Sequence, residues 1–291
     1  MRVGVVILPD ARWPAASDRW REAEARGFTT AWTYDHLSWR SLREGPWLGT
    51  VPLLAAVAAS TSTLRFGTLV ASPNFRHPAP LAKDVMTLDE ISGGRLDLGV
   101  GAGGGGYDST VLGLPPLTPA QRAARFEEFV DALDLLLREP ASSYSGEYFT
   151  AVDSRTYPGC TQRPRVPFTV AASGPKSLRV AARHGAAWVT VGGVGSHPSS
   201  EEWFDAVTRQ VAALASACET EGRDPATLRR VALVNLEADW AQGSIGAWDD
   251  FCGRVEELGF GDVVLHWPRP EDPSWPGPPP RVFDEICSRL R

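Results

Sequence analysis

Two patterns of hydrophobic and polar positions repeat along this chain. Short apolar runs, such as residues 64–70 and 96–100, have no regular polar positions, which is typical of parallel strands buried on both faces. Between these two runs, apolar residues recur every three or four positions over residues 80–92, which predicts an amphipathic helix that ends at Gly93 and Gly94. A strand, a covering helix and a second parallel strand form a βαβ unit, so we expect a parallel sheet here.

The same alternation continues through the whole chain and predicts eight strands and eight helices. The expected strands are residues 3–8, 29–34, 64–70, 96–100, 168–172, 187–191, 230–236 and 262–267. The expected helices are residues 14–26, 52–60, 80–92, a long helix begun by Thr118 and Pro119, 176–183, a helix capped by Ser199, 245–258 and 281–290. We therefore predict one domain over residues 1–291, an α/β (β/α)8 TIM barrel. Residues 139–167 lack periodicity and form an insertion between helix four and strand five, expected to be a functional loop.

Composition narrows the classes of partner. The net charge of -6, without a basic stripe, argues against nucleic acid, and the absence of a run of eighteen apolar residues argues against a membrane span. The start of the chain is broken by Pro9 and Asp10, so we expect no signal sequence and a cytoplasmic protein. The four cysteines stand singly without metal-ligand spacing, which predicts reduced thiols and no metal site.

The first candidate chemistry follows the second expected strand. Asp35 and His36 lie at its carboxyl end, where a barrel places its active site, and a histidine there can exchange protons near neutral pH. A purely structural role for this pair is equally compatible with the sequence. Trp39 and Trp47 either anchor the following loop or wall a substrate pocket.

Residues 99–104 match the pattern GxGxxG, but the dinucleotide fingerprint belongs in the first βαβ unit and opens directly into a helix. Residues 107–119 intervene here, so we reject a Rossmann site. We expect a loop whose exposed backbone N–H groups let a planar or phosphorylated ligand approach closely, with a flexible turn as the alternative.

A third candidate loop follows the fifth expected strand. Ser173, Gly174, Pro175 and Lys176 place a small turn at the start of a helix, on the same edge of the barrel. Backbone N–H groups at a helix N-terminus favour anions, so a phosphate is a suitable guest. An ordinary helix start at a proline explains the same residues.

Several sequence blocks together resemble the luciferase-like monooxygenase superfamily, most closely its deazaflavin branch. These blocks are residues 35–37, 67–73, 75–78, 81–83, 87–89, 92–95, 99–103 and 172–175. The resemblance implies a (β/α)8 barrel that binds FMN or coenzyme F420 at its carboxyl edge. It also implies a non-prolyl cis peptide at Leu69–Val70 and, because the family is commonly dimeric, a homodimer.

The resemblance also assigns roles to residues. It implies that Asp35 and His36 flank the reactive ring of the cofactor. The residues that it implies for cofactor binding are Thr68, Leu69, Val70, Gly101, Ala102, Gly103, Ser173, Gly174, Pro175 and Lys176. One position departs from the family: members that oxidise a sugar phosphate carry a glutamate just after the glycine block, where this chain has Gly104 and Gly105. We therefore do not expect that activity.

The sequence thus predicts an F420-dependent oxidoreductase that transfers a hydride between the deazaflavin C5 and a small organic substrate. His36 is expected to be the general acid or base and Asp35 to orient it. Trp39, Trp47 and residues 139–167 are expected to wall the substrate pocket. The alternatives are an FMN-dependent two-component monooxygenase and a non-catalytic flavin-binding relative.

Overall fold

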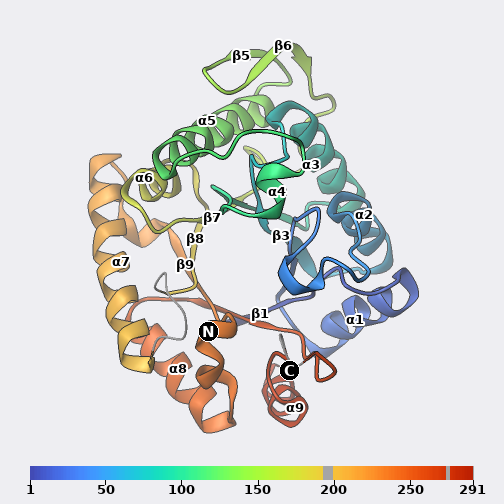
Figure 1. The fold of residues 1–291 in the computed structure, drawn as a ribbon, viewed down its shortest axis with the longest axis vertical. Coiled ribbons are helices and arrows are strands. Elements are labelled where there is room, and N and C mark those ends of the chain that lie inside the picture. The colour runs from blue at the N-terminus through green and yellow to red at the C-terminus, as the bar shows by residue number, and fades with distance from the viewer. Residues whose placement is uncertain (193–198, 273–275, 291) are drawn as a thin grey trace.

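A computed structural model describes residues 1–192, 199–272 and 276–290. Eight parallel strands close into a barrel in the order β1-β10-β9-β8-β7-β4-β3-β2, and helices surround it (Figure 1). The barrel strands are β1 (Arg2–Val6), β2 (Thr30–Thr33), β3 (Arg65–Ala71), β4 (Leu96–Gly101), β7 (Phe168–Ala171), β8 (Ala187–Thr190), β9 (Arg229–Leu233) and β10 (Asp262–His266). The predicted TIM barrel is therefore confirmed, with strand ends that differ from the expected ones by up to three residues.

The outer layer consists of one long helix after each barrel strand. These helices are α1 (Trp13–Arg26), α2 (Thr50–Ser60), α3 (Pro78–Ser92), α5 (Pro119–Arg138), α6 (Pro175–His184), α7 (Ser200–Thr220), α8 (Ile245–Glu257) and α9 (Pro280–Ser288). Shorter pieces lie in the loops: the helix α4 (Tyr107–Thr110) and the 3₁₀ turns η1 (Arg40–Leu42), η2 (Pro225–Thr227) and η3 (Leu236–Gln242). Among the described residues, no helix combines the length and apolar character needed to span a membrane. Residues 193–198, after β8, and residues 273–275, before α9, lie outside the described residues.

Side-chain caps explain where two of the long helices begin. Thr118 accepts a hydrogen bond from the Gln121 N–H at 3.3 Å, and the Gln121 side chain accepts one from the Thr118 N–H at 3.0 Å. Ser199 and Glu202 exchange the same pair of bonds at 3.3 and 2.8 Å. Each capping box satisfies two backbone donors that the helix leaves unpaired, and both helices begin after the residues that the sequence predicted as caps.

The insertion at residues 139–167 contains a hairpin of β5 (Ala141–Ser145) and β6 (Thr150–Arg155), which lies outside the barrel beside α5 (Figure 1). Glu128 on α5 accepts hydrogen bonds from the N–H groups of residues 147–149, the shortest at 2.6 Å. Lys83 on α3 donates to the Tyr157 carbonyl at 3.0 Å. The insertion is therefore fixed to the outer helix layer, which corrects the expectation that it walls the substrate pocket.

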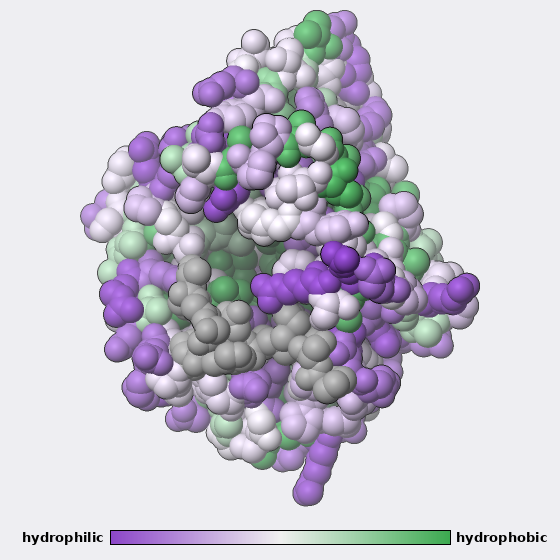
Figure 2. All heavy atoms as spheres, viewed as in Figure 1, coloured by the Kyte–Doolittle hydropathy of each residue, from purple (hydrophilic) through white to green (hydrophobic). Residues whose placement is uncertain are grey.

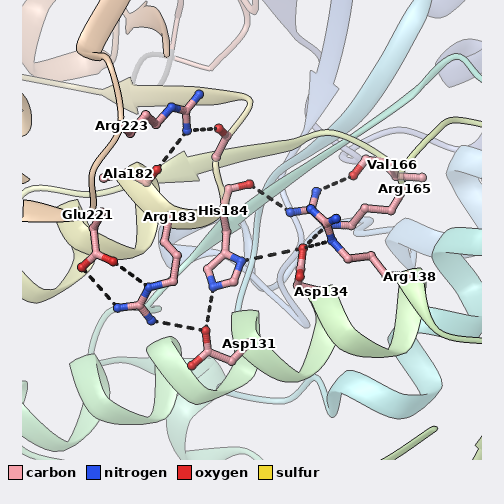
Figure 3. Close-up of polar contacts among 11 residues, drawn as sticks. Asp131, Asp134, Arg138, Arg165, Val166, Ala182, Arg183, His184, Glu221 and Arg223 are labelled. Atoms are coloured by element: carbon pink, nitrogen blue, oxygen red, sulfur yellow. Dashed lines mark hydrogen bonds and ion pairs between the residues drawn. The ribbon is translucent and has the colours of Figure 1, made fainter. Parts of the chain in front are cut away.

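A network of charged groups joins α5, α6 and the loop before β7 (Figure 3). His184 lies between two carboxylates of α5, donating from Nε2 to Asp131 at 2.6 Å, with Nδ1 3.7 Å from Asp134. Arg165 donates to Asp134 at 2.6 Å and to the His184 carbonyl at 3.0 Å. Burial disfavours the charged imidazole, but the two carboxylates outweigh it and raise the pKa of His184.

This network predicts a pH-dependent stability. Because the folded pKa of His184 lies above its unfolded value of about 6.5, its stabilising effect is complete below that value. The effect is lost as the pH rises through the raised folded pKa. We expect the Tm of His184→Gln to fall a few degrees below that of the wild type in mildly acidic buffer, and the gap to narrow in alkaline buffer. Thermal melts of both proteins across this range check the prediction, and a gap that widens with pH would contradict it.

Candidate active site

A cavity of about 730 Å³ opens at the carboxyl ends of the barrel strands. Its lining comes from the ends of β2, β3, β4, β7, β8 and β9 and from the loops that follow them. Figure 2 shows it as a hollow with hydrophobic surface inside. The apolar residues at its base are Leu69, Val70, Ala171, Val189 and Leu233. A (β/α)8 barrel places chemistry at this edge, so the cavity is the candidate active site.

The glycine-rich loop after β4 forms one side of the cavity. Gly101, Ala102 and Gly103 all line it, and a Cβ on Gly101 would come within 2.6 Å of a Val70 methyl carbon. Gly103 has φ +71°, a conformation that glycine adopts without strain. The Asn74 amide donates to the Gly104 carbonyl at 3.0 Å and holds the loop in place. Backbone rather than side chains therefore faces the ligand space here.

This part of the cavity fits a flat ring system. Leu69 and Val70 provide an apolar surface, and the peptide between them is cis, as the resemblance implied. At Gly104 and Gly105, no neighbouring atom lies within 4 Å of where a Cβ would stand, so this edge of the cavity is open. A deazaflavin or flavin ring could lie on this apolar surface with its edge against the glycine backbone.

His36 lies in the cavity wall and is held by Asp108. Its Nδ1 hydrogen-bonds Asp108 Oδ2, while the Leu37 N–H donates to the other carboxylate oxygen at 2.9 Å. A carboxylate only accepts, so Nδ1 carries a proton and Nε2 is the nitrogen that can exchange one with a ligand. Asp108 is 5% exposed, and it fixes both the tautomer and the ring orientation of His36.

Asp35 makes a different contact from the expected one. Its carboxylate is buried and accepts two bonds from the Arg76 guanidinium, at 2.6 and 3.0 Å. This bidentate pair ties the end of β2 to the loop after β3. The expectation that Asp35 orients His36 is therefore corrected, because Asp108 occupies that position.

The two tryptophans have different positions relative to the cavity. Trp39 lines the cavity with its ring centroid 4.3 Å from that of His36, and its role as a substrate wall stays a prediction. Trp47 does not belong to the described lining, and its indole N–H donates to the His36 carbonyl at 2.8 Å. Trp47 thus anchors the loop, the alternative that the sequence left open.

The turn before α6 is only partly at the cavity. Ser173 lines it, whereas Gly174 and Pro175 form the start of the helix and lie outside the described lining. Lys176 is half exposed and lies 3.3 Å from Glu127. Thr68 is buried and donates to the Gly99 carbonyl at 2.7 Å, so it joins β3 to β4. None of these four residues, Gly174, Pro175, Lys176 and Thr68, belongs to the described lining, so the cavity does not support the expectation that they contact the cofactor.

A second histidine, the buried His266 at the end of β10, contacts a residue of the cavity lining. The neutral His266 donates from Nδ1 to the Val234 carbonyl at 3.0 Å, and the hydroxyl of Tyr34, which lines the cavity, donates to Nε2 at 2.9 Å. Burial lowers the pKa of His266 to about 4. His266 therefore holds Tyr34 in place beside His36 and Trp39.

Sequence reasoning missed Asp108, Tyr34, Arg40 and Arg43, which all line the cavity. Asp108 follows a glycine run at the carboxyl edge of a strand, and that position was a usable signal. No spacing connects it to His36, which is 72 residues away in the chain. The arginines belong to a loop whose path only the three-dimensional structure shows.

The Asp108 contact gives a testable expectation. Asp108→Asn keeps the shape of the side chain but lets the amide present a donor to His36 Nδ1, which favours the wrong tautomer. We expect turnover to fall roughly 10- to 100-fold while cofactor affinity changes less than about threefold. Steady-state kinetics and a cofactor titration on the same variant check this. An unchanged turnover would show that the tautomer of His36 is irrelevant to the reaction.

Comparison with known proteins places the chain in a family. The family model described as luciferase-like monooxygenase matches residues 1–239. A protein of Beutenbergia cavernae named F420-dependent glucose-6-phosphate dehydrogenase is 30% identical, over 92% of this chain and 91% of its own length. A protein of Mycobacterium tuberculosis named F420-dependent hydroxymycolic acid dehydrogenase is 33% identical, over 81% of this chain and 63% of its own length.

The fold has solved counterparts as well. The structure of the coenzyme F420-dependent tetrahydromethanopterin reductase of Methanopyrus kandleri superimposes with a TM-score of 0.73 at 19% identity, covering 92% of this chain and 93% of that one. At that identity the likeness shows the shared barrel alone. Together with the family match over residues 1–239, these findings establish that the chain belongs to the luciferase-like monooxygenase family.

Proposed function

We propose that this protein is an F420-dependent oxidoreductase that moves a hydride between the deazaflavin and a small organic substrate. Relatives named as F420-dependent dehydrogenases align with most of the chain and support this cofactor. The observation that carries the proposal is a single cavity that combines an apolar floor and a glycine backbone with the His36–Asp108 pair. A flat redox ring and one proton-exchanging group are what hydride transfer to or from an organic molecule requires.

The residues of the cavity would have separate roles in cofactor binding and proton transfer. Leu69 and Val70 would support the ring face and Gly101 would admit its edge, with Ser173 as a further polar contact. The deazaflavin, when bound, supplies a hydride-transferring carbon. When the substrate is oxidised, His36 takes a proton from the substrate oxygen through Nε2, and Asp108 stabilises the imidazolium that forms; in the reverse direction this imidazolium returns the proton. The apolar floor keeps water from the reacting atoms.

The substrate we propose is not a sugar phosphate, although some relatives are named glucose-6-phosphate dehydrogenases. Gly104 and Gly105 line the cavity at the position where the family resemblance implies a glutamate in members that oxidise a sugar phosphate. Within the described lining, Asp108 is the sole carboxylate, and His36 already engages it. The proton chemistry therefore falls to His36.

Two further features belong to this proposal. The four cysteines are free thiols, which suits a reducing compartment such as the cytoplasm. A homodimer follows from the family resemblance. Sedimentation of the purified protein tests the dimer, and a monomer at micromolar concentration would refute it.

Turnover assays test the proposed reaction. Purified protein is mixed with F420 and a panel of secondary alcohols, and with reduced F420 and the matching ketones, while the visible absorbance of the deazaflavin is followed. We expect a protein-dependent change of absorbance in one of the two directions, either F420 with alcohols or reduced F420 with ketones. Reaction with reduced FMN and oxygen instead would favour the monooxygenase alternative, and no turnover with either cofactor would favour a binding protein.

A further inference from the structure

An exposed apolar surface lies at the mouth of the cavity, and we name it the apolar rim. Its members are Leu37, Tyr107, Val111, Leu112 and Leu114, which are 44%, 48%, 44%, 57% and 51% exposed. Figure 2 shows hydrophobic side chains gathered over α4 and beside it, next to the hollow. The rim accounts for five of the eleven large apolar side chains that are exposed in the described parts of the chain.

Hydrogen bonds from backbone N–H groups hold the apolar rim together. The Leu37 N–H donates to the Asp108 carboxylate at 2.9 Å, which brings the loop after β2 against α4. The Val111 N–H donates to the Tyr107 carbonyl at 3.0 Å, and the Gly113 N–H closes the next turn on Thr110 at 2.8 Å. Leu37 and α4, which are distant in sequence, therefore meet at the Asp108 carboxylate that orients His36.

The rim is continuous with the active-site cavity. Tyr107 belongs to both, since it lines the cavity and is also half exposed on the rim. The cavity base is itself apolar and Tyr107 belongs to the lining, so a long ligand can contact the base, Tyr107 and the apolar rim together, beside the polar side chains of the lining. Exposed apolar patches of this kind mark ligand or partner contacts, because exposure to water costs free energy that binding recovers.

We propose that the substrate is an amphiphile whose reacting hydroxyl or carbonyl lies beside His36 and whose apolar tail lies across the apolar rim. This rests on the proposed function, because it assigns the reacting end to the same cavity. The continuity through Tyr107 favours a substrate tail over other occupants. A second copy of the chain, or closure of residues 107–114 onto the cofactor, is an outcome that the test separates.

The test is a series of secondary alcohols from butanol to decanol, used as ligands of the F420-loaded protein. Calorimetry gives each dissociation constant, and turnover gives kcat/KM where reaction occurs. Each methylene that reaches the rim should tighten binding up to about fourfold. The double variant Leu112→Ser/Leu114→Ser should lose at least about tenfold of decanol affinity while butanol affinity stays within about twofold.

Val152→Ser provides the matched control, since Val152 is 81% exposed on β6, away from the described cavity lining. It should leave the whole series unchanged. An equal slope of affinity against chain length in the double variant and the wild type would overturn the proposal. A wild-type dimer that the double variant dissociates, or protection of residues 107–114 from hydrogen exchange by F420 alone, would also overturn it.

The same titrations separate this inference from the proposed function. If the protein binds no F420, the proposed function fails, but calorimetry of the alcohols with the cofactor-free protein still reports the chain-length slope. If F420 binds and turns over while the slope is absent, the amphiphile proposal fails alone.

Discussion

Replacing His36 with alanine should lower turnover at least about a hundredfold while F420 affinity falls less than about tenfold. A positioned acid or base contributes a factor of about 100 to 10,000 in rate, whereas one lost contact to a large cofactor costs nearer 1 kcal/mol. His36 lies in the cavity wall, and Asp108 sets its tautomer. Loss of the imidazole removes proton exchange but leaves Leu69 and Gly101, which would contact the cofactor ring, unchanged. Steady-state kinetics and a cofactor titration on the same purified variant measure both effects.

His77 offers a control histidine. It is exposed and caps α3 by accepting the Ala79 N–H at 3.2 Å, outside the described cavity lining. His77→Ala should cost about 1 kcal/mol of stability and leave turnover of the folded protein near normal. Near-normal turnover of His36→Ala would remove His36 from the mechanism, whatever happened to its stability.

Gly99→Ala should cause a large loss of stability. A Cβ on Gly99 would stand 1.9 Å from the Thr68 carbonyl oxygen, which is backbone of the neighbouring strand and cannot move aside locally. The barrel would have to separate β3 from β4, so we expect a loss of more than about 4 kcal/mol and a Tm lower by roughly 10 °C or more. Thermal melts, or the soluble yield if the variant does not fold, report the effect.

Gly105→Ala is the matched substitution. Gly105 lies in the same glycine-rich segment, but nothing is within 4 Å of its Cβ position. Its Tm should stay within about 2 °C of the wild type. Equal Tm values for both alanine variants would mean that close approach of β3 and β4 does not determine which positions require glycine.

Local chemistry explains why the sequence predicted the barrel well. The six residues of β4 are all buried, as expected for a parallel strand covered on both faces. Gly27 ends α1 with φ +93°, and the Thr118 and Ser199 caps begin α5 and α7. Each of these signals acts within a few residues of the feature that it predicts.

The predictions that needed distant partners were less successful. Nothing near His36 in the sequence shows that Asp108 contacts it, or that Arg76 engages the Asp35 carboxylate. Such contacts depend on how loops from different strands meet at the edge of the barrel. The insertion shows the same limit, since its backbone contacts with Glu128 on α5 decide that it lies outside the barrel rather than over the cavity.

The cavity should bind F420 more tightly than FMN, and a pair of binding titrations tests this most directly. The purified protein is titrated with F420 and with FMN under identical conditions, and the two dissociation constants are compared. We expect the lower dissociation constant for F420. A tighter constant for FMN would contradict it and point to a flavin monooxygenase.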